Sequence, residues 1–244
     1  TSAPTTVVPQ VPGYGGDVFV PAAAFASGLA GAFFQTDLEI NNPDPYPRSF
    51  RLYFRPRGAD TSIESGTFSL APNASVRYTN VLASVFGLEP DAVGALRCDS
   101  NSGDLLAMSR TYTVPGAKAA GTFGQGIPGV SLGQLIRYEE RGRILFMNEN
   151  RDARSNIGCL NDSTHVGDVT VQIELFNSAG ESLEVKTMEL PLRSNDQITR
   201  VFRDYAPITA GYVDVWTTTP GARIYCYGSV LDNETNDPTT VLPQ

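Results

Sequence analysis

Three cysteines are the residues whose chemistry could constrain this chain most strongly. Cys159 and Cys226 fall on predicted strands of one half of the chain, and Cys98 falls in the other half. In an oxidising compartment, Cys159 and Cys226 could form a disulfide between the two sheets of a β-sandwich, packed on the nearby Trp216. Two buried thiols are the alternative. Cys98 is expected to be a core residue, and no Cys-x-x-Cys or His-Cys spacing predicts zinc or thioredoxin-like chemistry.

His165, in the loop formed by residues 161–168, is the only histidine. A Ser-His-Asp triad would need it as the base, but no Gly-x-Ser-x-Gly turn accompanies it. A Ser-Lys or two-carboxylate enzyme stays open, because acidic residues are common in the loops. We expect an exposed loop histidine and predict no catalytic residues.

Three loops are rich in the oxygen ligands that calcium prefers: residues 99–104, 148–152 and 232–237. None of them matches the spacing of an EF-hand or of a Gly-Gly-x-Gly-x-Asp repeat. Turn formation accounts equally well for their Asp, Asn and Gly content. We therefore predict no metal site and no cofactor, with calcium binding as the alternative.

Two further sets of residues could bind or carry sugars. Asn73, Asn161 and Asn233 each begin an Asn-x-Ser/Thr sequence, the acceptor pattern for N-linked glycans. A planar row of exposed aromatic residues could stack on sugar rings, but alternation along a strand sends at least half of them to the core. Core packing is the favoured interpretation. The aromatic residues concerned are Tyr53, Phe54, Tyr112, Tyr212, Tyr225 and Tyr227.

The elements that must position these residues occur twice. Residues 190–202 (LPLRSNDQITRVF) repeat residues 70–82 (LAPNASVRYTNVL) at an offset of 190 − 70 = 120. Further along, residues 221–230 match residues 103–112 at an offset of 221 − 103 = 118. A period this long indicates a duplicated domain rather than a solenoid repeat.

Alternation of apolar and polar residues predicts short strands separated by turns. One short helix is predicted over residues 80–88, capped by Thr79 or Asn80. The glycine-rich residues 121–129 lack the strand-to-helix context of a phosphate-binding loop and are predicted to be an ordinary loop. The most clearly alternating strands are residues 36–40, 50–54, 75–78 and 105–113.

Many short strands with frequent turns are typical of antiparallel sandwiches. We therefore predict an all-β protein of two homologous, immunoglobulin-like antiparallel β-sandwich modules in tandem. The modules are residues 17–132 and 133–244, and residues 1–16 form an extended N-terminal arm. A chain of 244 residues is long enough for each module to bury its own core.

The charge of the chain excludes two classes of partner. A net charge of −8 argues against nucleic acid and anionic membrane surfaces. Only two of the 18 basic residues are lysines, and the arginines favour fixed, paired contacts. The most apolar run, residues 18–34, is broken by Pro21 and Gly28 and is shorter than the ~20 residues of a membrane span. We expect two strands with a turn there and no membrane insertion.

The N-terminal residues have the composition of a strand without a partner. Residues 1–16 are rich in Pro, Thr and Gly, and cannot form a core alone. The start at Thr1 is typical of an exported protein after signal-peptide removal, so we expect an extracellular or cell-surface location. The β-branched residues that could form the strand are Thr5, Thr6, Val7, Val8 and Val11.

Three stretches of the chain resemble a known family. They are GAFFQTDLEINNP, SRTYT followed by GTFGQGIP, and SVLDNETNDPTTVLP. These stretches resemble a tandem β-sandwich domain family found in secreted and cell-surface bacterial proteins. The resemblance covers nearly all of the chain after Val18. It implies an extracellular location and an immunoglobulin-like architecture, and it carries over no catalytic residues.

The expected function is that of a secreted, non-enzymatic structural protein. Copies would form a head-to-tail homo-oligomer, a filament or surface layer, joined by β-strand addition of the N-terminal arm. The alternative is an extracellular carbohydrate-binding or adhesion module with surface glycans as partners. A hydrolase that uses His165 or paired carboxylates is a third hypothesis.

Overall fold

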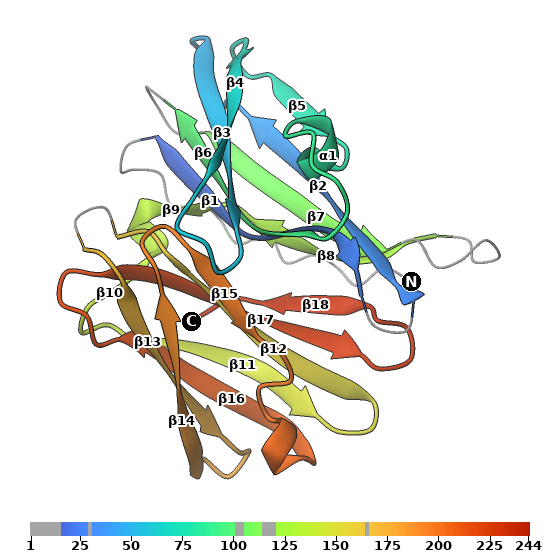
Figure 1. Ribbon diagram of the computed structural model, residues 1–244, viewed down its shortest axis with the longest axis vertical. Coiled ribbons are helices and arrows are strands. Elements are labelled where there is room, and N and C mark those ends of the chain that lie inside the picture. Colours follow the sequence, from blue (N-terminus) through green and yellow to red (C-terminus); the bar gives the residue numbers. More distant parts are fainter. Residues whose placement is uncertain (1–15, 29–30, 101–104, 114–120, 164–165) are drawn as a thin grey trace.

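The structure, a computed structural model, describes residues 16–28, 31–100, 105–113, 121–163 and 166–244. It confirms the predicted all-β class, with antiparallel sheets (Figure 1). The strands of the first half are β1 (Asp17–Ser27), β2 (Phe33–Asn41), β3 (Arg48–Pro56), β4 (Ile63–Leu70), β5 (Ser75–Tyr78), β6 (Ala92–Ser100), β7 (Leu106–Thr113) and β8 (Phe123–Pro128). Those of the second half are β11 (Gly142–Glu149), β12 (Ala153–Asn161), β13 (Val169–Phe176), β14 (Ser182–Leu190), β15 (Asn195–Ile198), β16 (Ile208–Thr217), β17 (Arg223–Asp232) and β18 (Pro238–Val241).

The strands of the two halves pair in the same order. The first half has the orders β4-β3-β6-β1 and β5-β2-β7-β8, and the pairing of β1 with β2 joins them into one nine-stranded sheet. The second half has β14-β13-β16-β11 as a four-stranded sheet and β15-β12-β17-β18 within a five-stranded sheet. Six antiparallel pairings of one half thus have counterparts in the other.

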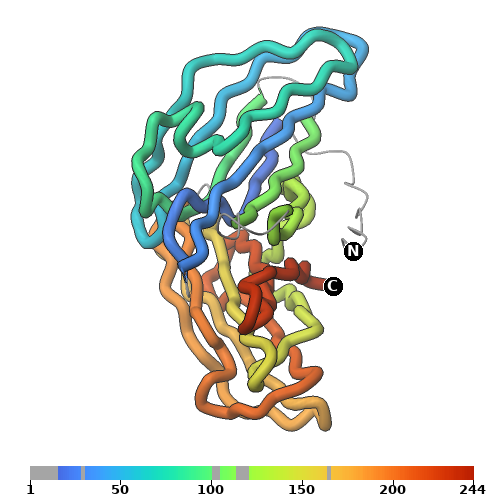
Figure 2. Tube along the Cα trace, turned by 90° about the vertical axis from the view of Figure 1, so that its right-hand side faces the viewer, coloured from blue at the N-terminus to red at the C-terminus, as the bar shows by residue number. Residues whose placement is uncertain are grey.

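A short segment connects the two halves. It contains β9 (Val130–Ser131), the 3-10 turn η2 (Leu132–Gln134) and β10 (Ile136–Arg137). β9 pairs with β1 of the first half, and β10 pairs with β17 of the second. The tube view shows the halves end to end along the long axis of the molecule (Figure 2).

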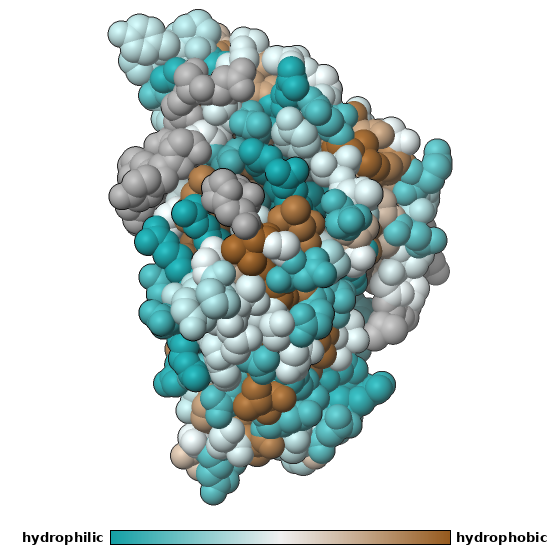
Figure 3. Space-filling model, turned by 60° about the vertical axis from the view of Figure 1, so that its left-hand side comes forward, coloured by the Kyte–Doolittle hydropathy of each residue, from teal (hydrophilic) through white to brown (hydrophobic). Residues whose placement is uncertain are grey.

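Each half has its own apolar core. In the first half, inward side chains of β2, β3 and β6 meet in one cluster, and β12, β13 and β16 supply a second cluster in the other half. Both clusters follow the alternation of strands, because every second residue faces inward. No helix among the described residues is long and apolar enough to cross a membrane. On the face shown in Figure 3, apolar side chains form small separate patches among polar ones.

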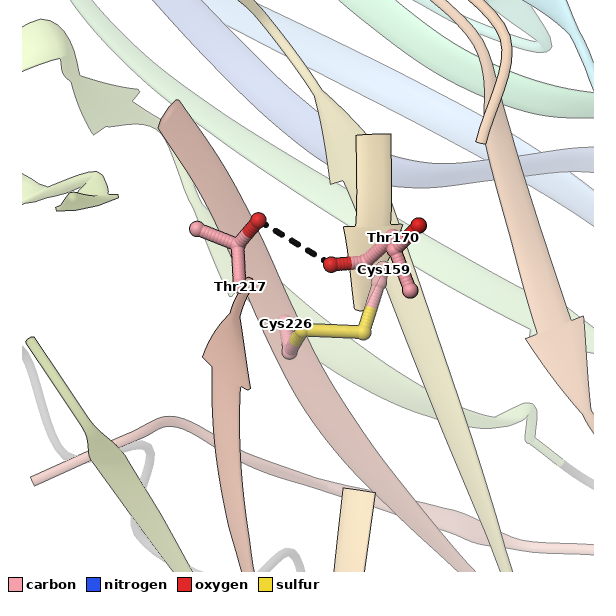
Figure 4. The surroundings of a disulfide bond; sticks show 4 residues. All are labelled: Cys159, Thr170, Thr217 and Cys226. Carbon is pink, nitrogen blue, oxygen red and sulfur yellow. Dashed lines mark hydrogen bonds between the residues drawn. A yellow bond between two sulfur atoms is a disulfide. The ribbon is translucent and has the colours of Figure 1, made fainter. Parts of the chain in front are cut away.

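The disulfide lies within a sheet and not between sheets. Cys159 and Cys226 are bonded, and they face each other on the neighbouring strands β12 and β17 (Figure 4). The expected packing on Trp216 is wrong as well. Val215 and Thr217 point into the core, so Trp216 between them points out of the sandwich. Cys98, as expected, is a buried core residue with a free thiol.

The repeat register differs by one residue from the sequence match at β7 and β17. The pair Ile40 and Ala107 of the first half corresponds to the pair Cys159 and Cys226 of the second half. The offset between β7 and β17 is therefore 226 − 107 = 119 rather than 118. A shift of one residue exchanges the inward and outward sets of a strand. The correct register is therefore needed to decide which side chains reach the surface.

Two predicted elements have a different structure. The helix expected over residues 80–88 is one turn, α1 (Val81–Ser84), and Asn80 at its start makes no side-chain cap. The second half has a short 3-10 turn, η3 (Arg203–Tyr205), at the equivalent place after β15. The expected loop at residues 121–129 contains β8, paired with β7. Its glycines allow this close pairing, because a Cβ on Gly124 would lie 2.4 Å from Cβ of Tyr112.

Candidate assembly surfaces

The two halves meet through outward faces of their sheets. The strands concerned are β1 and β3 of the first half and β12 and β17 of the second. A separate apolar cluster fills this contact, called here the internal junction, and it shares no residue with the two cores. Its buried members are Phe19, Val130, Leu135, Leu160 and Tyr225.

A buried ion pair lies beside this cluster. Nη2 of Arg55 is 2.9 Å from Oδ1 of Asp162, and their side chains are only 3% and 5% exposed. The guanidinium also lies over the ring of Phe19, 5.5 Å from its centroid. Burial raises the pKa of Asp162, and the positive charge of Arg55 opposes that rise. A buried pair of this kind adds little net stability, because the loss of hydration of both charges offsets their attraction.

Hydrogen bonds also cross the junction. The amide N–H of Gly58 donates to the carbonyl of Asn195 (2.8 Å), whose side-chain amide donates to the carbonyl of Arg55 (2.8 Å). Oγ of Ser229 donates to Oε1 of Gln125 (3.2 Å). With the apolar cluster and the ion pair, these bonds join the halves into one body.

Matched buried asparagines fix which residues of the two halves are equivalent. Asn42 directly follows the last residue of β2, and Asn161 is the last residue of β12. Both are fully buried, and each donates its side-chain amide to two carbonyls at the end of β4 or β14. β2 and β12 therefore correspond at an offset of 161 − 42 = 119.

In this register the junction residues of the second half have exposed counterparts in the first. Leu160 and Tyr225, which pair across β12 and β17, correspond to Asn41 and Leu106, which pair across β2 and β7. Tyr225 is 4% exposed in the junction, whereas Leu106 is 40% exposed. Met108, the counterpart of the buried Tyr227, is 36% exposed. We call Leu106 and Met108 the β7 face.

The junction residues of the first half also have counterparts on the surface. Phe19 of β1 pairs with Arg97 of β6. The equivalent pair in the second half is Arg143 of β11 with Asp214 of β16, so Arg143 is the counterpart of Phe19. Arg55 corresponds to Phe176, which pairs with Tyr212. This outward side of β11, β16 and β13 is called the β16 face. Its residues are Arg141, Arg143, Phe176, Tyr212, Asp214 and Trp216.

Aromatic rings and arginines alternate on the β16 face. The rings of Phe176 and Tyr212 are stacked at 4.7 Å, and the guanidinium of Arg143 lies over Tyr212 at 4.5 Å. Arg143 also donates two hydrogen bonds, of 2.7 and 2.8 Å, to Asp214, which raises the pKa of Arg143. Arg141 lies 3.8 Å from the ring centroid of Trp216.

This composition is typical of a protein-binding surface. Trp, Tyr and Arg are the residues most enriched at the energetically dominant positions of interfaces. The face is held rigid by its ring stack and its bidentate ion pair, so little side-chain freedom would be lost on binding. The β16 face is thus a candidate surface for contact with another protein.

One strand edge on the β7 face is open. In the second half, β10 adds to the start of β17, with Ile136 opposite Ile224. The counterpart of Ile224 is Leu105, at the start of β7 (224 − 119 = 105). β8 pairs with β7 from Met108 onward, and the N–H of Gly129 donates to the carbonyl of Ala107 (2.8 Å). No strand of the described residues pairs with Leu105 on this side.

The edge of β11 is less suited to strand addition. The backbone of Arg143 already exchanges hydrogen bonds with Gln244, of 3.2 and 2.8 Å. Beyond it the strand has a bulge at Leu145 and Phe146, where Phe146 takes a φ of 65°. A bulge twists an edge away from regular pairing, so the start of β7 is the better acceptor.

Several predicted site residues lie outside the described residues. They are the arm residues Thr5, Thr6, Val7, Val8 and Val11, and the loop residue His165. Within the described residues, no group of three or more His, Cys, Asp or Glu side chains could hold a metal ion. In two of the three loops considered for calcium, Asn150 and Asp232 accept backbone N–H groups within their own turns.

The three glycan acceptor candidates differ in accessibility. Asn161 is fully buried and its amide donates three hydrogen bonds, so a glycan there is incompatible with this fold. Asn233 is half-buried and donates to the carbonyls of Asn150 and Arg151. Asn73 is exposed in the turn before β5 and stays a prediction.

The aromatic residues proposed as a sugar platform are dispersed. Phe54, Tyr112, Tyr225 and Tyr227 are buried. Tyr53 and Tyr212 are half-buried, and each lies beneath an arginine guanidinium. The sequence did not single out Leu106 and Met108. Their signal was present, since apolar residues at outward positions of a strand mark a buried or binding face.

No protein-family model matches the chain, and no curated protein sequence matches it significantly.

Proposed function

We propose that the chain is a secreted, non-enzymatic structural protein that assembles head to tail with copies of itself. In this proposal the two halves are homologous sandwich modules, residues 17–132 and 133–244, of an extracellular filament or surface layer. The family resemblance and the predicted export support the location. One structural observation carries the proposal: both faces used at the internal junction have counterparts elsewhere on the molecule whose side chains are mostly exposed or half-buried.

The contact between copies would repeat the internal junction. The β16 face of one copy would pack on the β7 face of the next, as Phe19 packs on Leu160 and Tyr225 within the chain. The two faces differ from each other and lie on different halves. Their contact is therefore heterologous, which extends into a filament when it does not close into a ring.

Strand addition by the N-terminal arm would complete this contact. At the internal junction, packing of the faces is accompanied by addition of β10 to the start of β17. We place the arm of a neighbouring copy at the equivalent position, the start of β7 beside Leu105 and Leu106. Main-chain hydrogen bonds would supply affinity, and alternate residues such as Val7 and Val11 would fill pockets.

The test uses one variant of each face. Leu106→Asp disrupts the β7 face, and Tyr212→Ala removes the ring stack of the β16 face. Each variant alone should fail to form polymers, measured by sedimentation velocity, because every chain lacks one half of the contact. Mixed together, they should form dimers through the intact face of each partner.

A matched control separates this effect from general loss of solubility or fold. Ile63, on the edge strand β4, is 39% exposed, close to the 40% of Leu106. Ile63→Asp should polymerise like the unmodified chain. Polymers formed by Leu106→Asp alone, or equal loss in Ile63→Asp, would refute the assignment of the two faces.

Polysaccharide binding through a row of aromatic rings, the alternative function, has less support. Stacking on sugar needs a bare ring face. Of the six strand aromatics proposed, four are buried and two are covered by arginines, as described above.

A further inference from the structure

A cleft of about 430 Å³ lies between the two halves, away from both candidate assembly faces. One wall is formed by residues of β1, β2, β6, β7 and β8, and the other by residues of β12, β15 and β17 and of the turn after β15. This volume is within the range of small-molecule sites, roughly 300–1,000 Å³. Since the halves are fixed by the internal junction, the cleft is already formed.

The cleft is positively charged in a chain of net charge −8. Four arginines line it, and none of its lining residues within the described part of the chain is Asp or Glu. One of them, Arg200, is neutralised from behind by the buried Glu149, with N–O distances of 2.7 and 2.8 Å. The other three arginines are Arg57, Arg154 and Arg203.

These three arginines lack carboxylate partners among the described residues. Arg154 is buried and donates to the amide oxygens of Asn233 and Asn236, at 2.9 and 2.7 Å. Burial and the nearby charge of Arg200 lower the pKa of Arg154, and the charges of Glu149 and Asp232 oppose this shift. Arg57 and Arg203 are exposed, and neither forms an ion pair with another of the described residues. Their guanidinium groups are therefore available to bind an anion that enters the cleft.

The remaining walls would suit a sugar ring. Polar side chains of Asn156, Gln197 and Thr199 offer donors and acceptors for hydroxyl groups. Opposite them, Ala22, Ala24 and Phe34 form an apolar wall for the C–H side of a ring. An arginine guanidinium can donate two parallel hydrogen bonds to one carboxylate.

We propose that this cleft binds an acidic saccharide, with the carboxylate of a uronic acid unit held by Arg57, Arg154 and Arg203. The site is independent of self-assembly, because it uses neither the β7 face nor the β16 face. It would give an extracellular structural protein a means to attach to an acidic polysaccharide.

The test is calorimetric titration of the full chain with a trimer of galacturonic acid. A neutral galactose trimer and inorganic sulfate serve as comparison ligands. We expect binding of the acidic trimer only. Arg57→Gln and Arg203→Gln should each weaken it about tenfold or more, since a charge-assisted hydrogen bond contributes about 1.5–3 kcal/mol.

Arg137→Gln is the matched control, because Arg137 is an exposed arginine outside the cleft. It should bind as the unmodified chain does. Equal affinity for the neutral trimer or for sulfate would overturn the proposal, as would unchanged binding in both cleft variants. Absence of binding by the acidic trimer would overturn it as well. None of these results depends on whether the chain polymerises.

Discussion

The disulfide between Cys159 and Cys226 should contribute a large share of the stability of the second half. It closes a loop of 67 residues. The chain-entropy relation for a loop of that length gives about 4 kcal/mol, through restriction of the unfolded chain. The corresponding pair in the first half, Ile40 and Ala107, occupies the same inward positions without a covalent bond.

That natural counterpart supplies the variant for the test. Cys159→Ile combined with Cys226→Ala gives the second half the residue pair of the first and keeps the core apolar. Urea unfolding of the variant, followed by circular dichroism, should show a free energy of unfolding about 4 kcal/mol below that of the oxidised chain. The oxidised chain should also have the smaller dependence on urea, because its cross-linked unfolded state exposes less surface.

Reduction is the control for packing changes. Dithiothreitol should destabilise the unmodified chain by a similar amount and leave the variant unchanged. Equal midpoints for the oxidised, reduced and substituted chains would refute the reasoning. A destabilisation of the variant much larger than that caused by reduction would mean that Ile and Ala do not fit this site.

Three further predictions follow from single sites. Asp162→Ala should lower the free energy of unfolding in urea by about 3–5 kcal/mol, because it leaves the guanidinium of Arg55 buried without a partner. The double variant Arg55→Met with Asp162→Leu should lower it much less, and equal losses in the two variants would contradict this prediction. Burial raises the pKa of Cys98, so its thiol should not react with a thiol reagent at pH 8 until urea unfolds the chain; rapid labelling of native protein would contradict its burial. Hydrogen bonds from Thr235 and Glu234 hold the pKa of Asp232 below 3.8, so its stabilising effect is present above that pH and is lost as the pH falls through the folded pKa; an NMR titration midpoint at or above 3.8 would contradict this.

Much of the architecture can be predicted from the alternation of apolar and polar residues within single strands. The strands predicted over residues 36–40, 50–54 and 75–78 lie within β2, β3 and β5. Alternation is a local property, and burial of one face enforces it. The repeat then places Cys159 and Cys226 on equivalent strands of one half.

The surfaces were harder to predict, because they depend on register between strands. An offset of 118 at β17 instead of 119 exchanges its inward and outward residues, and thereby hides the correspondence of Leu106 with Tyr225. The disulfide was expected between sheets because spacing along the chain does not show which strands pair in one sheet, and β12 and β17 do. The cleft arginines come from three separate segments, and only the packing of the two halves brings them together.

Light scattering of the full chain and of residues 17–244 would test the central claim most directly. The full chain should form polymers many times its own mass, because the arm and the two faces act together. The truncated chain should be monomeric at the same concentration, with its fold intact by circular dichroism. A full chain that stays monomeric, or truncated chains that polymerise equally well, would contradict assembly by the N-terminal arm.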